Sequence, residues 1–405
     1  MNLMLNILLL TLTGLIAVPV LVLFIECMAA RLARKPAAIA ADQLPAKIGL
    51  LISAHNEELV IEATVRSLMM QLRPGDQLTV VADNCTDLTA RIARSAGAQV
   101  LERNDTTKRG KGYGLAFGVE YLKQNPPDVL VLFDADMVIQ PGVVERLALE
   151  AARHQRPIQA QYIQQAPPEA GAKGSVSTLA FIVKNAVRPA GLDFFGVPCA
   201  LTGTGMAFPW SLIESAPLAS GHLVEDMELG LHFLRAGKGP KLCSAVTIVG
   251  DLPGDSKTAY IQRTRWEHGH LGIIKAHVLP LLFGGLIRFR LDMLASAFDL
   301  AVPPLALVVA CWGAALMASL AAGFLRHLWL PAEISTLTGI MMMIAILSAW
   351  RQHARHLPAQ SLLAIPAYIF WKVPLYAKFL LRRQTAWVRT DRTAMPPAAR
   401  GASLA

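Results

Sequence analysis

The sequence has few charged residues, and its cysteines form no pattern of a disulfide frame or a metal site. Only 17% of its 405 residues are Asp, Glu, Lys or Arg, whereas 54% are hydrophobic. The five cysteines include no CxxC pair and have no metal-ligand spacing with histidine, which is typical of free thiols in a reducing compartment. The sequence also has no internal repeat and no long low-complexity segment. It therefore indicates no disulfide-stabilised or repetitive architecture.

The basic residues do not indicate a nucleic-acid partner, although the net charge is +9. Lys and Arg flank hydrophobic segments and do not form a single stripe interleaved with aromatic residues. The positive-inside rule expects this placement at the cytosolic ends of membrane helices. We therefore expect the positive charge to set membrane orientation.

Three long apolar segments predict membrane-spanning helices. They are residues 3–25, 300–325 and 334–350. Basic residues follow the first and third segments, namely Arg31, Arg34, Lys35, Arg351 and Arg355. Because basic residues follow the first segment and do not precede it, an anchor is favoured over a cleaved signal peptide. With the N-terminus outside, the chain between the first two segments is cytosolic.

A fourth apolar segment, Ser361–Leu381, is predicted to lie at the membrane surface. It contains two lysines and two prolines and leads into a basic tail, which a crossing would leave outside. The predicted organisation is an N-terminal transmembrane anchor at 1–35, a cytosolic domain at 36–275, an interfacial segment at 276–299, two transmembrane helices at 300–352, and an interfacial helix with a basic cytosolic tail at 353–405.

Between the anchors, short β-like runs alternate with helical ones. Strands are expected at 48–53, 78–82, 99–101, 129–133 and 159–162, and helices at 57–70, 87–95, 112–122 and 142–152. This alternation predicts a doubly wound α/β sheet. Such sheets bind ligands beyond the carboxyl ends of their strands, so polar residues directly after each apolar run are the candidates for a site.

Two aspartates, Asp134 and Asp136, follow the apolar run Val129–Phe133. A spacing of two residues places both side chains on the same side of an extended chain. Two acids there need a cation, and Mg²⁺ or Mn²⁺ also bound by diphosphate oxygens meets that need. The alternative is a turn with solvated aspartates. We predict Asp134 and Asp136 as metal ligands.

Two further polar clusters end predicted strands. His55, Asn56 and Glu57 follow the first strand, and Asp83 and Asn84 follow the second. Side chains there can bind a ribose or a uracil-like base. Equally, Asp83 or Asn84 can cap the following helix. The sequence leaves both roles open.

Lys111 belongs to a run of glycines and cations, residues 106–114, that precedes a predicted helix. Such a run suits phosphate, but it is no Walker motif and lacks the GxGxxG pattern. Glu225 and Asp226 open another helical stretch, where an acid serves either as a cap or as a general base for an acceptor hydroxyl.

Gln262, Arg265 and Trp266 lie in an Arg-rich segment just before apolar sequence. Arg265 can bind departing diphosphate through two hydrogen bonds, and Trp266 can stack on the face of a sugar. Arg and Trp are also ordinary anchors at a membrane surface. Both interpretations stand from the sequence alone.

In their order along the chain, these clusters resemble the motifs of family 2 glycosyltransferases, the group that includes cellulose, chitin and hyaluronan synthases and ceramide glucosyltransferase. The resemblance covers about residues 46–275. The matching positions are Asn56 and Glu57 of the nucleotide-binding segment, Asp83 as the first motif aspartate, Asp134 and Asp136 as DxD, Thr202–Met206 beneath the acceptor, Glu225 and Asp226 as the ED-type motif with Asp226 as base, and Gln262, Arg265 and Trp266 as QxxRW. The family often has Pro-x-Tyr before Asn-Glu. This chain has Ser53-Ala54-His55 instead, so stacking by a tyrosine is not carried over.

The resemblance implies a GT-A (nucleotide-diphospho-sugar transferase) doubly wound domain with transmembrane helices at both ends. It also implies inverting transfer, usually from a UDP-sugar, with Mg²⁺ or Mn²⁺ as cofactor. The residues expected to bind the donor are His55, Asn56, Glu57, Asp83, Lys111, Asp134, Gln262, Arg265 and Trp266. The expected location is a bacterial inner membrane, with the catalytic domain in the cytoplasm.

The sequence does not decide whether the acceptor is a growing glycan or a lipid, and it slightly favours a glycan. QxxRW suggests a processive polysaccharide synthase, possible partners being other polysaccharide-assembly proteins, but three spans are few for a translocation channel. A second hypothesis is a catalytically silent membrane scaffold that binds a nucleotide sugar within a polysaccharide-export complex. The presence of all four motif aspartates favours the enzyme.

Overall fold

A computed structural model of the protein describes residues 2–33, 44–167, 170–252 and 256–381. The chain divides into two compact units. Of the described residues, the sheet unit comprises 44–165, 198–252 and 256–266, and the helical unit comprises 2–33, 166–167, 170–197 and 267–381. Residues 166–197 and 267–275, predicted within the α/β domain, group with the helical unit. The basic tail predicted after residue 381 lies outside the described residues.

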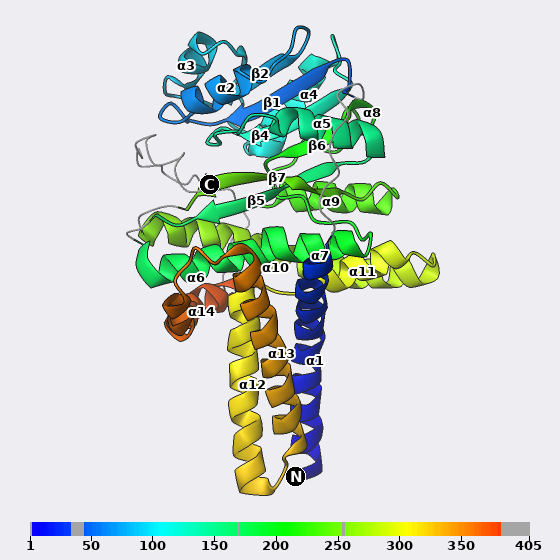
Figure 1. The fold of residues 1–405 in the computed structure, drawn as a ribbon, viewed down its shortest axis with the longest axis vertical. Helices are drawn as coiled ribbons and strands as arrows, with labels where there is room; N and C mark the ends of the chain where they lie inside the picture. The colour runs from blue at the N-terminus through cyan, green and yellow to red at the C-terminus, as the bar shows by residue number, and fades with distance from the viewer. Residues whose placement is uncertain (1, 34–43, 168–169, 253–255, 382–405) are drawn as a thin grey trace. The chain divides into compact units, whose positions relative to one another are not determined.

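The sheet unit is built on a seven-stranded sheet with the order β3-β2-β1-β4-β6-β5-β7 (Figure 1). The strands are β1 Ile48–Ala54, β2 Gln77–Asp83, β3 Gln99–Arg103, β4 Val129–Asp134, β5 Ile158–Gln165, β6 Met206–Pro209 and β7 Lys241–Asp251. Strands β1 to β4 are parallel, whereas β6 is antiparallel to β4 and β5. The α/β class is therefore confirmed, and the sheet is mixed.

The helices of this unit fall between the strands, as the alternation predicts. They are α2 Ile61–Met69, α3 Thr89–Ser95, α4 Lys111–Leu122, α5 Val143–His154, α8 Trp210–Ile213 and α9 Glu225–Arg235. The central strands β1, β2 and β4 are buried along almost their whole length. Unbroken apolar runs are typical of parallel strands that are covered on both faces.

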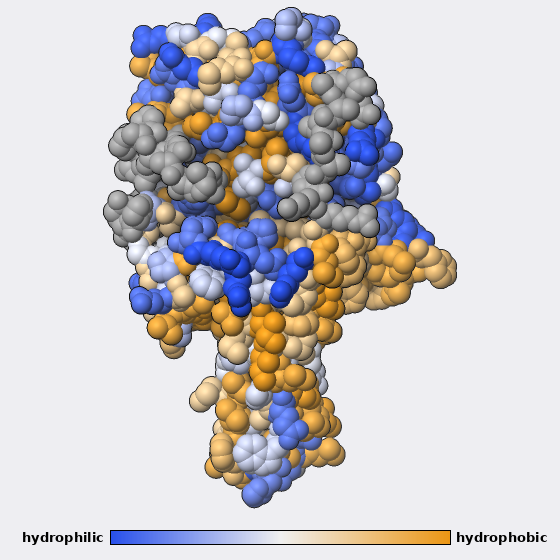
Figure 2. Space-filling view, viewed as in Figure 1, coloured by the Kyte–Doolittle hydropathy of each residue, from blue (hydrophilic) through white to orange (hydrophobic). Residues whose placement is uncertain are grey.

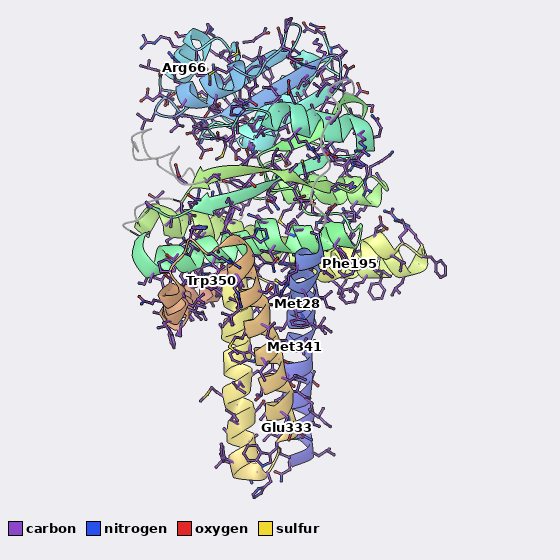
Figure 3. The ribbon with its side chains drawn as sticks, in the orientation of Figure 1. Met28, Arg66, Phe195, Glu333, Met341 and Trp350 are labelled. Carbon is purple, nitrogen blue, oxygen red and sulfur yellow. The ribbon has the colours of Figure 1, made fainter. Side chains whose placement is uncertain are left out.

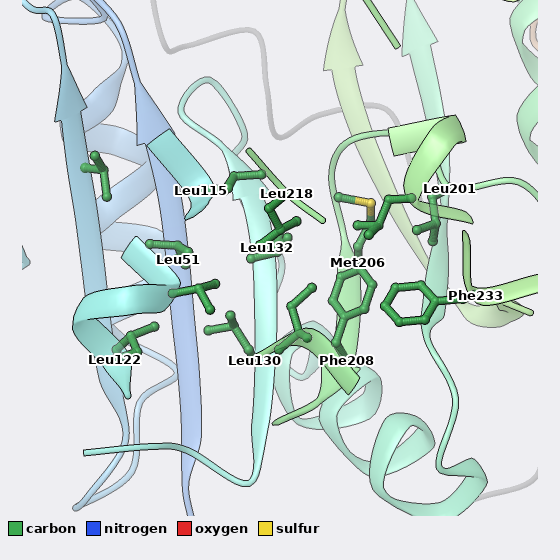
Figure 4. Close-up of a cluster of buried hydrophobic side chains, with 14 residues drawn as sticks. Leu51, Leu115, Leu122, Leu130, Leu132, Leu201, Met206, Phe208, Leu218 and Phe233 are labelled. Atoms are coloured by element: carbon green, nitrogen blue, oxygen red, sulfur yellow. The ribbon is translucent and has the colours of Figure 1, made fainter. Parts of the chain in front are cut away.

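The core of the sheet unit lies between the sheet and helices α4 and α9. Figure 4 shows Leu51, Leu130 and Leu132 of the sheet facing this cluster, with Phe208 beside Phe233. The rings of Phe208 and Phe233 have centroids 5.8 Å apart. This packing holds the first turns of α4 and α9 near the carboxyl ends of the strands.

Two glycines allow α4 to lie close to the sheet. A Cβ on Gly118 would lie 2.5 Å from Leu51 Cδ1, and one on Gly114 would lie 2.2 Å from Ser53 Oγ. Both distances are shorter than real Cβ contacts. Gly114 and Gly118 are therefore explained by the packing of α4 against β1, whereas a Cβ on Gly112 would lie 2.4 Å from Leu218 O.

The helical unit contains three helices that run side by side (Figure 1). They are α1 Asn2–Ala29, α12 Leu305–Arg326 and α13 Leu330–His353. Val20, Val308 and Met342 pack at their shared centre. Trp312 Nε1 on α12 donates a hydrogen bond to Ser335 O on α13, at 2.8 Å. Figure 2 shows hydrophobic surface along this bundle.

Charged or aromatic residues mark the two ends of α13. Figure 3 shows Glu333, Met341 and Trp350 in succession along it. At 1.5 Å per residue, the 17 steps from Glu333 to Trp350 span about 26 Å, close to the thickness of a hydrocarbon core. Arg351 follows directly. The length of α13 therefore suits one membrane crossing.

The rest of the helical unit consists of shorter elements and the second part of α10. These are η1 Ala30–Leu32, α6 Gly171–Ile182, a π-helix Val183–Val187, α7 Arg188–Phe194, α10 Ser256–Ile287, α11 Leu291–Leu300, η5 Ala359–Ala364 and α14 Ile365–Leu381. Figure 1 shows α6, α7 and α11 lying across one end of the bundle. Helix α10 begins in the sheet unit and continues into the helical unit.

Within the described residues, four helical segments are long and apolar enough to cross a membrane. They are Asn2–Leu32, Thr258–Ile287, Leu305–Arg326 and Leu330–His353. Three coincide with the predicted spans. The fourth, Thr258–Ile287, crosses the predicted boundary between the cytosolic domain and the interfacial segment. The membrane-surface placement of residues 276–299 and of α14 stays a prediction.

A buried ion cluster joins three elements of the helical unit. Arg188 Nε on α7 donates to Glu26 Oε2 on α1 at 2.6 Å, and its Nη2 donates to Asp299 Oδ1 on α11 at 2.5 Å. Burial alone would lower the pKa of Arg188, but the two carboxylates raise it above its ordinary value. Breaking a buried pair by removing one partner costs about 3–5 kcal/mol, so this cluster fixes how α1, α7 and α11 meet.

Candidate active site

The loops after β1 and β2 are tied together, so that two predicted clusters form one surface. His55 Nδ1 lies 2.7 Å from Asp83 O. Asn56 Oδ1 accepts the Thr86 amide at 2.7 Å, and the Glu57 amide donates to Thr89 Oγ1 at 2.7 Å. Asn56 has a φ of 53°, which is uncommon for a residue other than glycine. The described contacts of Asn56 and Glu57 hold the loop in shape.

Asp83 is buried at the end of β2 and bonded through one carboxylate oxygen. Its Oδ1 accepts Arg103 Nη1 at 2.5 Å and Asn84 Nδ2 at 2.9 Å. The guanidinium of Arg103 also lies over the Tyr113 ring, 5.7 Å from its centroid. It is Asp87 whose Oδ1 accepts the Thr89 amide at the start of α3. Asn84 Oδ1 accepts the Asp105 amide at 2.8 Å, and the N-cap residue of α3 is Leu88, so neither Asp83 nor Asn84 caps that helix.

Arg103 was not singled out from the sequence. It ends β3 opposite Asp83 in the parallel register. The signal that could have found it is the same one that found Asp83, namely a polar residue at the carboxyl end of an apolar strand. Strand β3 is an exposed edge with only five residues, so its end was harder to locate.

The Lys111 side chain links the end of β4 to the loop that contains Gly203. Its Nζ donates to Asp134 Oδ1 and to Gly203 O, both at 2.5 Å. A Cβ on Gly203 would lie 3.6 Å from that Nζ and 3.3 Å from Asp226 Oδ2. Asp134, Lys111 and Asp226 therefore meet around Gly203, from the end of β4 and the starts of α4 and α9.

The electrostatic setting of Lys111 follows from this arrangement. Burial would lower the pKa of Lys111, but the negative charges of Asp134, Glu225 and Asp226 raise it above its ordinary value. The lysine therefore stays protonated at neutral pH. A protonated lysine offsets the mutual repulsion of three acids that lie close together.

The segment Thr202–Met206 forms one wall of the site and is held by a buried glutamine. Gln159 Nε2 on β5 donates to Thr204 O at 2.9 Å, and its Oε1 accepts the Thr202 amide at 2.8 Å. Thr204 Oγ1 in turn accepts the Asp134 amide at 3.0 Å. Sequence reasoning did not assign Gln159. It is one of four glutamines in β5, so the sequence does not distinguish it from the others.

Asp226 uses its two carboxylate oxygens differently. Oδ1 accepts the Met227 amide at 2.8 Å, which satisfies a donor at the start of α9. Oδ2 is the oxygen next to Gly203 and Lys111. A small, mostly apolar cavity is lined by Glu225 and Asp226 together with Leu218. The helix-terminal role and a role in the site are thus compatible in one side chain.

Asp136 does not continue the extended chain. Strand β4 ends at Asp134, and Ala135 and Asp136 form a turn. Ala135 O accepts Thr64 Oγ1 at 2.7 Å, which fixes that turn. The spacing argument therefore applies only up to Asp134, and the turn sets the direction of Asp136. Its role as a metal ligand stays a prediction.

The carboxylates of this site are suited to a cation that a bound substrate also coordinates. In the described part of the chain, no group of three or more His, Cys, Asp or Glu side chains could hold a metal ion by itself. Mg²⁺ and similar ions are commonly held by one or two carboxylates plus substrate phosphates. The Asp134 side chain is 30% exposed and so can be reached from solvent.

Gln262, Arg265 and Trp266 lie on α10 and are half-buried. Residues three and four apart share one face of a helix, so these three side chains project from the same side of α10. Their approach to Asp134 and Asp226 stays a prediction.

Comparisons with known proteins agree with this picture. Residues 45–269, more than half of the chain, match the family described as glycosyltransferase like family 2. The probable glycosyltransferase YdaM of Bacillus subtilis is 24% identical over 261 residues, which is 57% of each protein. The chain thus spans little more than half the length of that relative. A 4,4'-diaponeurosporenoate glycosyltransferase of Staphylococcus aureus is 45% identical over 65 residues, 16% of this chain and 17% of that protein.

A solved structure shares the fold over almost the whole chain. It is the mannosyltransferase PcManGT from Pyrobaculum calidifontis, in complex with GDP-Man and Mn²⁺. The TM-score is 0.55 at 19% identity, and the likeness covers 94% of this chain and 100% of that one. This confirms the predicted GT-A fold class.

Proposed function

Because the chain belongs to the glycosyltransferase-like family 2, we propose that it transfers a sugar from a UDP-sugar to a hydroxyl group of a glycan or lipid, with inversion at the anomeric carbon. The reaction takes place at the cytoplasmic face of a bacterial inner membrane. The observation that carries this proposal is the meeting of Asp134, Lys111 and Asp226 at one edge of the sheet.

Asp226 is the general base of the proposed reaction. Its Oδ2 takes the proton of the acceptor hydroxyl as that oxygen attacks the anomeric carbon. The bond from that carbon to the diphosphate breaks at the same time, and UDP leaves with the bonding electrons. A single displacement of this kind inverts the anomeric configuration. Glu225, which lines the same cavity, adds to the negative charge near the acceptor.

Lys111, Asp134 and Asp136 bind the diphosphate end of the donor. Lys111 is protonated and has a flexible side chain, so its ammonium group can bind diphosphate oxygens. Asp134 and Asp136 would hold Mg²⁺ or Mn²⁺, which, when bound, neutralises charge on the departing diphosphate. Gln262, Arg265 and Trp266 close the site over the donor.

Asp83 and Arg103 support uracil as the base of the donor. Asp83 is a hydrogen-bond acceptor and Arg103 is a donor, and they lie side by side. The N3–H and O4 groups of uracil present the complementary pair. Cytosine, with an amino group and an unprotonated N3, does not. Guanine presents a similar edge, so binding assays must compare UDP with both GDP and CDP.

Asp83→Asn should weaken UDP binding by about 10- to 100-fold, because a hydrogen bond to a charged group is worth about 1.5–3 kcal/mol. Isothermal titration of the purified protein with UDP, GDP and CDP measures this. The matched control is Arg94→Met, which removes an exposed ion pair with Glu102 near the same edge. UDP affinity equal to that of the wild type in Asp83→Asn would show that Asp83 does not bind the base.

The acceptor is proposed to be a growing glycan or a lipid. The QxxRW residues favour a glycan, whereas the four helices that are apolar enough to cross a membrane support a lipid acceptor. The staphylococcal relative is named for 4,4'-diaponeurosporenoate, which keeps an acceptor other than a glycan in the proposal. Sizing of the products decides, since a ladder of lengths indicates processive synthesis and one glycolipid indicates single addition.

The whole proposal is tested with the full chain in detergent or nanodiscs. Radiolabelled UDP-sugars are supplied with Mn²⁺ or Mg²⁺, or with a chelator, and transfer to endogenous acceptors and release of UDP are measured. We expect transfer that requires the divalent ion. Tight binding of a UDP-sugar without any transfer would instead favour a silent scaffold of a polysaccharide-export complex.

A further inference from the structure

Helices α10 and α14 of the helical unit are joined by a buried ion pair that the proposed reaction does not use. Lys372 Nζ on α14 donates to Glu267 Oε1 on α10. Their side chains are 6% and 12% exposed. The pair links positions 105 residues apart in the sequence.

More contacts surround this pair. The Lys372 ammonium lies 4.9 Å from the centroid of the Tyr368 ring. His268 is fully buried, and its Nε2 lies 3.0 Å from Leu375 O. The His268 ring meets the edge of Phe379, with centroids 5.3 Å apart. Two consecutive residues of α10 are therefore held by successive turns of α14.

The Lys372 side chain remains charged in this setting. Burial alone would lower the pKa of Lys372, but the charge of Glu267 raises it above its ordinary value. Burying two charges costs several kcal/mol per ion, and an apolar pair of similar size is often at least as stabilising. Stability alone therefore does not explain the pair, whereas a requirement for one defined helix orientation does.

The ion pair lies next to the QxxRW residues in the sequence. Glu267 and His268 directly follow Trp266 in the continuous helix α10. Successive residues of a helix are about 100° apart, so holding two neighbours fixes the rotation of the preceding turn. That turn bears Gln262, Arg265 and Trp266.

We propose that α14 is a brace for α10, and that Lys372 and Glu267 are positioning residues for Arg265 and Trp266. This rests on the proposed function, in which those two side chains close the site. The brace acts through the rotation of α10, without contact with the substrate.

The first test replaces Lys372 with methionine, an unbranched side chain that is one heavy atom shorter and carries no charge. We expect kcat to fall by about 10- to 100-fold while KM for the donor changes less than about twofold, because Arg265 acts on charge that develops in the transition state. Lys372→Arg should restore most of the rate. Lys378→Met, an exposed lysine on the same helix, is the matched control and should leave kcat unchanged.

A double-mutant cycle distinguishes positioning from a general structural role. In an Arg265→Lys background, Lys372→Met should cost less than about threefold more, because residues that act through one another are not additive. If the two effects multiply in full, the brace does not act through Arg265, and the proposal is overturned.

Hydrogen exchange of backbone amides tests the brace without any turnover. In Lys372→Met, residues 262–268 should exchange at least about tenfold faster, with no change in β1 or β4, since local opening of one element is separate from global unfolding. This result is expected even if no sugar is transferred, so a failure of the proposed function is distinguishable. Unchanged exchange at 262–268 in an active enzyme would refute the brace alone.

Discussion

Asp226→Asn should reduce the rate of sugar transfer by about 10²- to 10⁴-fold, which is the usual contribution of a general base. An amide cannot take the proton of the acceptor hydroxyl. The substitution is nearly isosteric, and the amide oxygen can still accept the Met227 amide, so α9 should begin as before. Donor binding should change little, since Asp226 acts on the acceptor. Single-turnover transfer and UDP titration together measure these two quantities.

Two variants show whether the effect belongs to Asp226 itself. Glu225→Gln tests the neighbouring acid of the same cavity and should lose less than Asp226→Asn. Glu214→Gln changes an exposed acid just after α8 and should keep the wild-type rate. Wild-type turnover in Asp226→Asn would mean that another group is the base.

Asp134→Asn should lower transfer by at least about 100-fold, because charge stabilisation by a divalent ion is worth several kcal/mol. It should also weaken the binding of Mn²⁺, which electron paramagnetic resonance measures directly in the presence of UDP. A chelator should stop transfer by the wild type, and added Mn²⁺ or Mg²⁺ should restore it. These readouts separate loss of the ion from loss of the fold.

The matched control for this substitution lies at the other end of the same strand. Asp128→Asn changes an exposed aspartate that accepts the Lys47 amide just before β4, and it should leave Mn²⁺ binding unchanged. Asp136→Asn tests the second predicted ligand, which lies in the turn after β4. Mn²⁺ affinity equal to that of the wild type in Asp136→Asn would remove Asp136 from the site and leave Asp134.

Much of the sheet unit could be predicted because its central strands are unbroken apolar runs. The runs predicted at 48–53 and 129–133 are β1 and β4 to within one residue. Two strands of the sheet were missed. Strand β6, Met206–Pro209, has only four residues and ends in proline, so it shows no period. Strand β7 carries a register shift against β5, which breaks its alternation.

The candidate site could be predicted only in part, for a similar reason. Asp83, Asp134 and Asp226 were found because each ends or begins an element of local sequence. Gln159 was not found because its role depends on partners far away in the sequence, and Arg103 was not found because it ends a short, exposed edge strand. The ion pair between Lys372 and Glu267 belongs to this second group as well.

The sequence by itself determined three of the four long apolar helices, the positions of the first five strands along the chain and the acids at the strand ends, since each depends on the chemistry of a few neighbouring residues. The tertiary structure alone decided that Lys111 lies between Asp134 and Asp226, and that residues 166–197 group with the helical unit. Such contacts arise only when elements distant in the chain pack against one another, and no local pattern records which surfaces will meet.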